Sequence, residues 1–182
     1  MLLTMLLYHV AVTTVDDYPT RREPHRRAHI ERLTGLRQAG ALVGGGPAPD
    51  GKTADIFYRV RQPDQLERLV EEDPYRLGGV WTAWTARSFT HFVEPWEQPP
   101  IVLDGSRKVT IVEGPVTDPA MAEFVLIDLR GAARMAFGGF FEGGHTLAVA
   151  TTPDAEAALD SFRDTGFWKP DALTARPLLY VL

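Results

Sequence analysis

The chain has 182 residues, of which 45% are hydrophobic and 24% are charged. This balance is typical of globular proteins and excludes an intrinsically disordered chain. The sequence contains no cysteine, which excludes disulfides, thiolate zinc sites, iron–sulfur clusters and cysteine nucleophiles. The formal charge of -5 argues against nucleic acid as a partner, because nucleic-acid-binding proteins usually present a net basic face.

No stretch of the sequence reaches the roughly 20 consecutive apolar residues that a membrane-spanning helix needs. The apolar residues 1–7 lack the positive region and the small-residue cleavage site of an export signal. We therefore expect a cytoplasmic protein that has no membrane partner.

The first half of the chain predicts two helices set among four strands. Pro24 stands in the first turn of one helix and Gly40 follows its last turn, while Leu66, Leu69 and Val70 form an apolar stripe on the other. The expected strands are 3–12, 41–45, 53–60 and 80–89, and the expected helices are 24–39 and 63–72. This order is β-α-β-β-α-β, which is the ferredoxin-like arrangement.

The second half repeats this order after a proline-rich break. Gln62-Pro63-Asp64 recurs as Thr152-Pro153-Asp154, and Thr85-Ala86-Arg87 recurs as Thr174-Ala175-Arg176, at nearly the same separation. The expected strands are 108–112, 134–137, 146–150 and 175–181, and the expected helices are 119–129 and 153–162. We therefore expect a tandem duplication, with domains at 1–93 and 106–182 and a proline-rich linker at 94–105.

The topology of the first copy brings two chemically interesting side chains to one edge. Both helices of such a unit pack on the same face of the sheet and run antiparallel. His29 shares an inward side of its helix with Leu33 and Leu36, and Asp73 ends the second helix on its apolar side. Helices packed side by side lie about 8–10 Å apart, so the two side chains can meet across the gap. A paired aspartate would fix the histidine tautomer and raise the basicity of the ring, which suits general acid–base catalysis.

Simpler interpretations of the same residues remain open. Asp73 before Pro74 is also a good N-cap for a short helical turn ending at Leu77, and that role alone could account for it. His25 and His29 share a helix face and could bind a metal with Asp73, although such a pair in an arginine-rich helix is more often solvated. Gly44, Gly45 and Gly46 are better explained as a strand end that allows close helix approach than as a phosphate-binding loop. We expect no metal and no tightly bound cofactor.

The first half also resembles the YCII-related family of the dimeric α+β barrel superfamily. The resemblance covers about residues 5–93, and the matching positions occur in the order that is usual for the family. These positions are Arg26, His29, Leu33, Leu36, Gly40, Gly46-Pro47, Asp73-Pro74-Tyr75, Gly79-Val80, Trp84 and Arg87. The resemblance implies that His29 and Asp73 are the functional pair. It also implies a pocket between the helices and the sheet.

The expected substrate-binding residues surround this pair. They are Arg26, Tyr8, His9, Pro47 and Tyr75. Tyr8 and His9 are neighbours on the first strand and therefore point to opposite faces, so only one of them can face the helices. Arg26 and Arg59 could attract an anionic substrate, although exposed arginines are usually only solvated.

The second copy departs from this pattern. Its first helix has no histidine, and Arg163 or Asp164 stands where the first copy has Asp73. We expect the second copy to act as a scaffold. It would cover the open face of the first sheet, as a partner subunit does in relatives that dimerise. The fold class is therefore expected to be α+β, with two tandem ferredoxin-like units forming an intrachain dimeric α+β barrel, and a further homodimer is possible.

The resemblance leads to a functional expectation with two alternatives. Relatives include a dehydrochlorinase that acts on a substituted hydroquinone, muconolactone-isomerase-like enzymes and small monooxygenases. We expect a lyase or isomerase that uses His29 and Asp73 on a small, cyclic, oxygenated substrate. The alternatives are a non-catalytic ligand-binding or assembly protein with a vestigial site, and a cofactor-free monooxygenase.

Overall fold

The computed structural model describes residues 5–182, and the chain divides into two compact units. The first unit contains Met1–Ser88, Pro100–Leu103 and Tyr180–Leu182, and the second contains Phe89–Pro99 and Asp104–Leu179. The units therefore differ from the expected domains in two places. Residues 89–93 lie with the second unit, and the last three residues pack in the first, while the expected linker 94–105 is divided between the two units.

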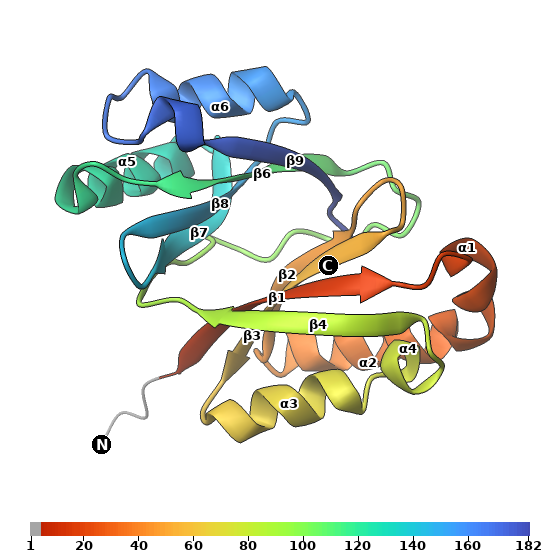
Figure 1. Cartoon of the computed structure of the whole chain (residues 1–182). Helices are drawn as coiled ribbons and strands as arrows, with labels where there is room; N and C mark the ends of the chain where they lie inside the picture. The colour runs from red at the N-terminus through yellow and green to blue at the C-terminus, as the bar shows by residue number, and fades with distance from the viewer. Residues whose placement is uncertain (1–4) are drawn as a thin grey trace. The chain divides into compact units, whose positions relative to one another are not determined.

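The first unit is a four-stranded antiparallel sheet with its two longer helices, α2 and α3, on one face (Figure 1). The strand order is β2-β3-β1-β4, which is the ferredoxin-like order. The elements are β1 (Leu6–Thr14), α1 (Tyr18–Arg21), α2 (Glu23–Gln38), β2 (Leu42–Pro47), β3 (Thr53–Val60), α3 (Pro63–Glu71), α4 (Pro74–Leu77) and β4 (Trp81–Ser88). The predicted β-α-β-β-α-β order is confirmed. Residues 3 and 4 of the first predicted strand lie outside the described residues.

The second unit repeats this order with one added strand. Its sheet has the order β5-β7-β8-β6-β9 and is antiparallel throughout. The elements are β5 (His91–Val93), β6 (Lys108–Pro115), α5 (Pro119–Gly131), β7 (Met135–Phe141), β8 (His145–Ala150), α6 (Ala155–Arg163), the 3-10 turn η1 (Pro170–Ala172) and β9 (Thr174–Leu179). Sequence patterns did not predict α1, β5 or η1, which are each only three or four residues long.

Helix boundaries in the first unit follow ordinary capping chemistry. Proline stands in the first turn of both α2 and α3, where its missing N–H costs nothing. At α3, the Gln62 side chain accepts from the N3 backbone and the Gln65 side chain accepts from the Gln62 backbone, which forms a capping box. Gly40 follows α2 with a φ of 74°, a left-handed conformation that favours glycine. These signals set both ends of α2 and the start of α3.

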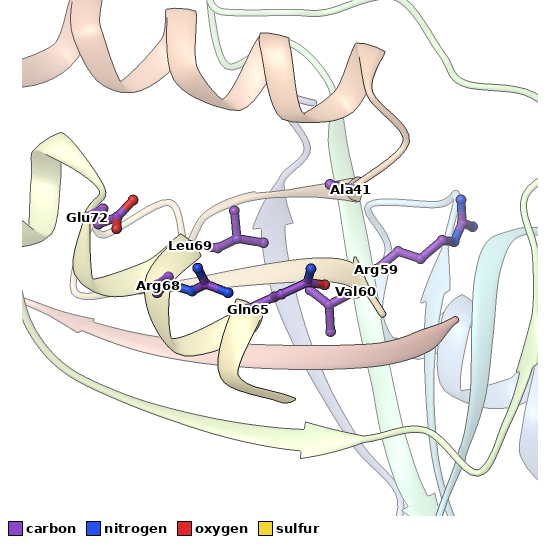
Figure 2. Close-up of a pocket in the computed structure, with 7 residues that line it drawn as sticks. All are labelled: Ala41, Arg59, Val60, Gln65, Arg68, Leu69 and Glu72. Carbon is purple, nitrogen blue, oxygen red and sulfur yellow. The ribbon is translucent and has the colours of Figure 1, made fainter. Parts of the chain in front are cut away.

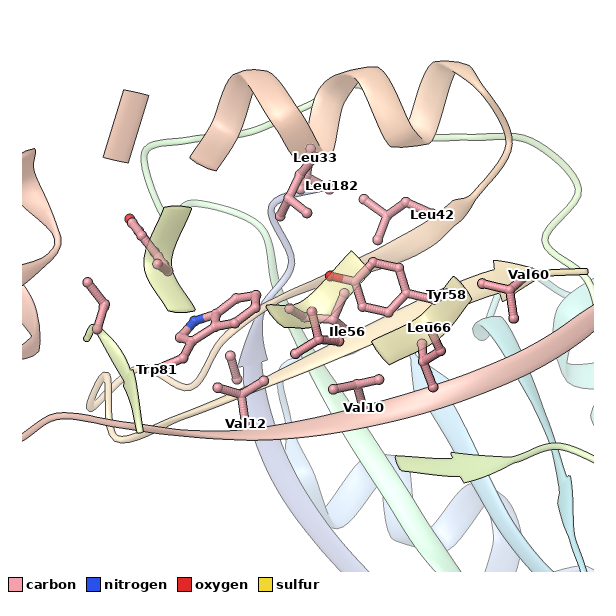
Figure 3. Close-up of a cluster of buried hydrophobic side chains, with 14 of the residues drawn as sticks. Val10, Val12, Leu33, Leu42, Ile56, Tyr58, Val60, Leu66, Trp81 and Leu182 are labelled. Atoms are coloured by element: carbon pink, nitrogen blue, oxygen red, sulfur yellow. The ribbon is translucent and has the colours of Figure 1, made fainter. Parts of the chain in front are cut away.

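The first unit has a core between its helices and its sheet. Alternate residues of β1 and β3 face the helices and pack with Leu33 of α2 and Leu66 of α3 (Figure 3). The buried strand residues of this cluster include Val10, Val12, Ile56, Tyr58 and Val60. Because side chains alternate along a strand, His9 and Phe57 lie on the opposite face of the sheet.

Residues 180–182 extend the first sheet at its β2 edge. The Val181 and Leu182 N–H groups donate to the Gly45 carbonyl, and the Gly45 N–H donates to the Leu182 carbonyl. A Cβ at Gly44 would overlap the Tyr180 hydroxyl, so this approach requires glycine at that position. The prediction that the glycine run admits a helix was therefore wrong, because it admits this extended segment instead. The added chain protects an edge strand that would otherwise expose unpaired backbone groups.

No helix among residues 5–182 combines the length and the apolar character that crossing a membrane would require.

Glu71 makes the stability of the first unit depend on pH. The Trp84 Nε1–H donates to Glu71 Oε1 at 2.7 Å and the Arg76 Nε–H donates to Oε2 at 2.9 Å, which hold the pKa of Glu71 below its ordinary value. A depressed carboxyl pKa stabilises the fold above the unfolded-state pKa, and this stability is lost as the pH falls through the folded value. We expect the Glu71→Gln variant to be less stable than wild type near pH 7 and equally stable once the pH is well below about 4, measured by urea unfolding. A stability difference that stays constant with pH would contradict this account.

Candidate functional site

His29 and Asp73 form a buried hydrogen-bonded pair. The His29 Nδ1 atom lies 2.7 Å from Asp73 Oδ1. Asp73 is 0% exposed and His29 is 7% exposed. His29 comes from the second turn of α2, and Asp73 is the residue between α3 and α4. The structure therefore brings together two side chains that are far apart in sequence, at the edge of the unit where the topology predicted them.

Asp73 also has the structural role that was left open. Its Oδ1 accepts the Tyr75 N–H at 2.8 Å and so caps α4. The same oxygen therefore accepts two hydrogen bonds, from the helix backbone and from the imidazole. The capping bond holds Oδ1 in place, and this oxygen in turn orients the His29 ring.

Aromatic side chains hold the His29 ring in place. The Tyr75 ring stacks on it with centroids 3.7 Å apart and planes 10° apart, and the Trp81 ring meets it edge-on at 5.4 Å. Tyr75 and Trp81 are both nearly fully buried. Tyr75 was expected to bind substrate, but the structure shows it packed against the histidine, so its first effect is to orient the ring. Burial raises the pKa of Tyr75 well above its ordinary value, so its hydroxyl stays protonated.

This geometry determines which nitrogen of His29 is available. An ionised carboxylate only accepts hydrogen bonds, so Nδ1 must carry the proton that is shared with Asp73. In the neutral ring Nε2 then keeps its lone pair. Among residues 5–182, Nε2 has no hydrogen-bond partner. His29 can therefore accept a proton at Nε2 while Asp73 stabilises the resulting imidazolium.

His9 belongs to a different buried cluster. Its Nε2 lies 2.6 Å from Asp55 Oδ1, and the Arg87 Nη2–H donates to Nδ1 at 3.1 Å. Because Nδ1 accepts, Nε2 must carry the proton. Both ring nitrogens are therefore engaged within the first unit, and the His9 lone pair is not available as a base. The expectation that His9 joins the site of His29 is not supported, because His9 lies on the other face of the sheet.

Two other expected substrate-binding residues are Tyr8 and Pro47. Tyr8 faces the helices and lies opposite Ser88 on β4 and Tyr58 on β3, whereas Trp81 lies opposite Thr14, six residues further along β1. Pro47 lies on β2, at the opposite edge of the sheet from the strand that carries Trp81. Among residues 5–182, neither Tyr8 nor Pro47 has a hydrogen bond or a ring contact with the pair.

Arg26 lies close to the site. It precedes His29 by one helical turn. Burial raises the pKa of Tyr75, and the positive charges of Arg22 and Arg26 oppose this rise. Its Nη2 donates weakly to the Leu103 carbonyl at 3.4 Å, and the contact is exposed. A positively charged side chain therefore stands at the rim of the pair.

Metal binding by the two histidines of α2 has no geometric support. The His25 ring covers Gly78 and would collide with any Cβ placed there. Within residues 5–182, no three histidine, aspartate or glutamate side chains come together as a group that could hold a metal ion.

A separate groove of about 350 Å³ lies between α3 and the ends of β2 and β3 (Figure 2). Its lining residues are Ala41, Arg59, Val60, Gln65, Arg68, Leu69 and Glu72. Figure 2 shows the Arg59 side chain extending away from Leu69 and Glu72. Because neither member of the buried pair lines this groove, Arg59 is not part of the candidate site.

The second unit has no equivalent pair. The buried positions of α5 are Ala122, Leu126 and Leu129, and none of these side chains can move a proton. Beyond the end of α6, the buried Trp168 packs edge-on against Phe162. Arg163, at the end of α6, pairs with Glu156 and Asp160. Asp164 after it is exposed, so neither Arg163 nor Asp164 is buried as Asp73 is in the first unit.

Comparisons with known proteins give a fold but no family. No protein-family model matches the chain, and no curated protein matches it. A candidate monooxygenase from Lactobacillus acidophilus is similar in structure, with a TM-score of 0.62 and 12% identity over 97% of this chain and 94% of that chain. A candidate monooxygenase from Fusobacterium nucleatum has a TM-score of 0.59 and 9% identity over 100% of this chain and 94% of that chain.

A dehydrochlorinase from Burkholderia phenoliruptrix, solved with 2,5-dihydroxybenzoquinone, covers 47% of this chain and 94% of its own, with 19% identity and a TM-score of 0.42. A likeness at that level assigns no activity to this chain. The two full-length matches share the mixed α+β architecture with two antiparallel sheets. The chain therefore has the mixed α+β fold of these two structures.

Proposed function

We propose that the chain is an enzyme that moves a proton on a small, cyclic, oxygenated substrate, in a lyase or isomerase reaction. His29 is the general base and then the general acid, and Asp73 orients it. The observation that carries this proposal is the buried 2.7 Å contact between His29 Nδ1 and Asp73 Oδ1. It leaves Nε2 as the basic atom of a ring that is held rigidly.

The first step consists of one proton transfer. The Nε2 lone pair takes a proton from a carbon or hydroxyl group of the substrate, and the electrons of that bond move into the substrate ring and onto an oxygen. The imidazolium that forms is stabilised by Asp73. In an isomerase reaction Nε2 returns the proton to a different atom, and in a lyase reaction the electron pair expels a leaving group.

The surroundings of His29 favour an anionic or electron-rich ring as the substrate. Arg26 provides a positive charge at the rim, where it can stabilise the oxyanion that forms when the proton leaves. Tyr75 and Trp81 are nearly fully buried against the imidazole, so their contribution is to fix the orientation of the ring. An oxygenated ring offers the acidic proton that His29 would take and the developing negative charge that Arg26 would stabilise.

The proposal is tested by a ligand screen followed by isotope exchange. A panel of cyclic 1,3-diketones, hydroquinones and hydroxyquinones is first screened by thermal shift. Each ligand that raises Tm is then incubated in D₂O, and loss of the C–H signal is followed by proton NMR. We expect at least one ligand to exchange faster with protein than in the buffer blank. Ligands that raise Tm but exchange only at the blank rate would contradict the proposal and indicate a non-catalytic binding protein.

A further inference from the structure

Three polar atoms in the interior of the first unit have no hydrogen-bond partner. They are the Tyr58 hydroxyl, the Asp73 Oδ2 atom and the Arg32 Nε atom, each of which is buried and unpaired among the described residues. Tyr58 and Asp73 are both 0% exposed. An unpaired buried polar atom is costly, so three of them in one unit call for an explanation.

The three atoms belong to one neighbourhood. Arg32 stands one turn beyond His29 on α2. Its Nη2 lies 3.4 Å from the Leu69 carbonyl oxygen and 3.6 Å from Oε2 of Glu72, and Glu72 is the residue before Asp73. Figure 3 shows the Tyr58 hydroxyl pointing into the core on the side where Trp81 lies, and Trp81 contacts His29. Burial raises the pKa of Tyr58, the charge of Asp73 raises it further, and the charge of Arg32 opposes the rise. Both charged groups therefore act on the Tyr58 hydroxyl.

The hydrogen-bonding capacities of the three atoms are complementary. The Tyr58 hydroxyl and the Arg32 Nε–H are donors, and the Asp73 Oδ2 atom is an acceptor. None of them bonds directly to another. A buried water typically makes about three hydrogen bonds to groups of this kind. A single water that accepts from Tyr58 and Arg32 and donates to Asp73 would satisfy all three.

We propose that one buried water joins the Tyr58 hydroxyl and the Arg32 Nε–H to Asp73 Oδ2, and that Tyr58 is thereby a positioning residue for the His29–Asp73 pair. The inference deepens the proposed function and rests on it for its catalytic meaning. Asp73 Oδ1 is held by His29 and by the Tyr75 N–H. With Oδ2 held by the water, the carboxylate can no longer rotate, and the His29 ring keeps one orientation and one tautomer.

The sign of the stability change in Tyr58→Phe tests the bridge. If the hydroxyl is bonded through the water, its removal breaks a hydrogen bond, and we expect the unfolding equilibrium constant to rise about fivefold. If the hydroxyl is an orphan, phenylalanine removes a buried unpaired group and the protein becomes more stable. Tyr8→Phe is the matched control, because Tyr8 pairs with Tyr58 across the strands on the same face but is only partly buried, and its hydroxyl is not one of the buried unpaired atoms. A stabilised Tyr58→Phe protein would overturn the proposal.

A spectroscopic readout separates positioning from stability. The Nδ1 proton of His29 resonates far downfield when it is hydrogen-bonded to a carboxylate. Loss of the bond at Oδ2 leaves more electron density at Oδ1, so we expect Tyr58→Phe to move this signal further downfield and Tyr8→Phe to leave it in place. An unmoved signal in Tyr58→Phe would refute the positioning role.

A crystal structure of the wild-type chain tests the bridge even if Tyr58→Phe does not fold. We expect one ordered water within hydrogen-bond distance of all three atoms, and an empty site would overturn the bridge. None of these measurements needs a substrate. Failure of the bridge would leave the proton-transfer proposal standing, whereas failure of the isotope-exchange test would leave the bridge intact as a purely structural feature.

Discussion

Replacing His29 by glutamine is expected to lower the rate of substrate proton exchange by about 10²- to 10⁴-fold, the usual contribution of a positioned general base. Glutamine fills a similar volume and can still donate a hydrogen bond to Asp73 Oδ1, but it has no basic lone pair to replace that of Nε2. The fold should therefore survive while the chemistry stops. The measurement is the exchange rate at saturating ligand, by the NMR assay in D₂O.

His25→Gln provides the matched control for this substitution. His25 lies one turn earlier on the same helix. Its ring packs over Gly78, and it does not hydrogen-bond to Asp73. We expect its exchange rate to stay within about twofold of wild type, because surface-type substitutions away from the site change little. Equal rates in His29→Gln and wild type, with both proteins folded, would remove His29 from the mechanism.

Replacing Asp73 by alanine is expected to destabilise the protein by about 3 kcal/mol, because the cap of α4 is lost and two buried donors are left without an acceptor. These donors are the Tyr75 N–H and the His29 Nδ1–H, which share Asp73 Oδ1. Urea unfolding at neutral pH measures the change. A loss below about 1 kcal/mol would show that the two bonds are exchanged for water in solution.

Asp73→Asn distinguishes the structural role of Asp73 from its chemical role. The amide oxygen can still cap α4 and accept from His29, so we expect a smaller loss of stability, about 1 kcal/mol. The rate of proton exchange should nevertheless fall by about 10²-fold or more, because a neutral amide does not stabilise the imidazolium. An asparagine variant with wild-type exchange would mean that Asp73 contributes only its cap.

The sequence predicted the fold and the meeting of His29 with Asp73 because both follow from periodicity and topology. The apolar stripe of α3 places Asp73 on its inner side, and the antiparallel packing of two helices on one face brings their facing ends together. Asp73-Pro74 similarly predicted α4, because an N-cap before proline is a strong local signal.

Other features depend on contacts that local patterns do not encode. The alternation of β1 placed Tyr8 and His9 on opposite faces, but it could not show that His9 pairs with Asp55 or that Tyr8 lies opposite Tyr58 and Ser88. The position of Trp81 just after α4 gave no sign that its ring meets His29. The short β5 has too few residues to show alternation, so its place in the second sheet was not predicted.

The Tyr58 hydroxyl shows a further limit of strand patterns. Its place on one face with Ile56 and Val60 correctly predicted burial. The same pattern says nothing about where a long side chain leans along the sheet. The hydroxyl lacks a partner because of how α2 and Asp73 surround it, which the strand pattern does not encode.

The tautomers of the two buried histidines test the central claim most directly. Long-range proton–nitrogen NMR correlation on ¹⁵N-labelled protein, at a pH where both rings are neutral, reports which nitrogen of each ring carries the proton. The geometry predicts a protonated Nδ1 in His29 and a protonated Nε2 in His9, with the His29 preference weakened in Asp73→Asn. A protonated Nε2 in His29, or a mixture of both forms that Asp73→Asn leaves unchanged, would contradict the account.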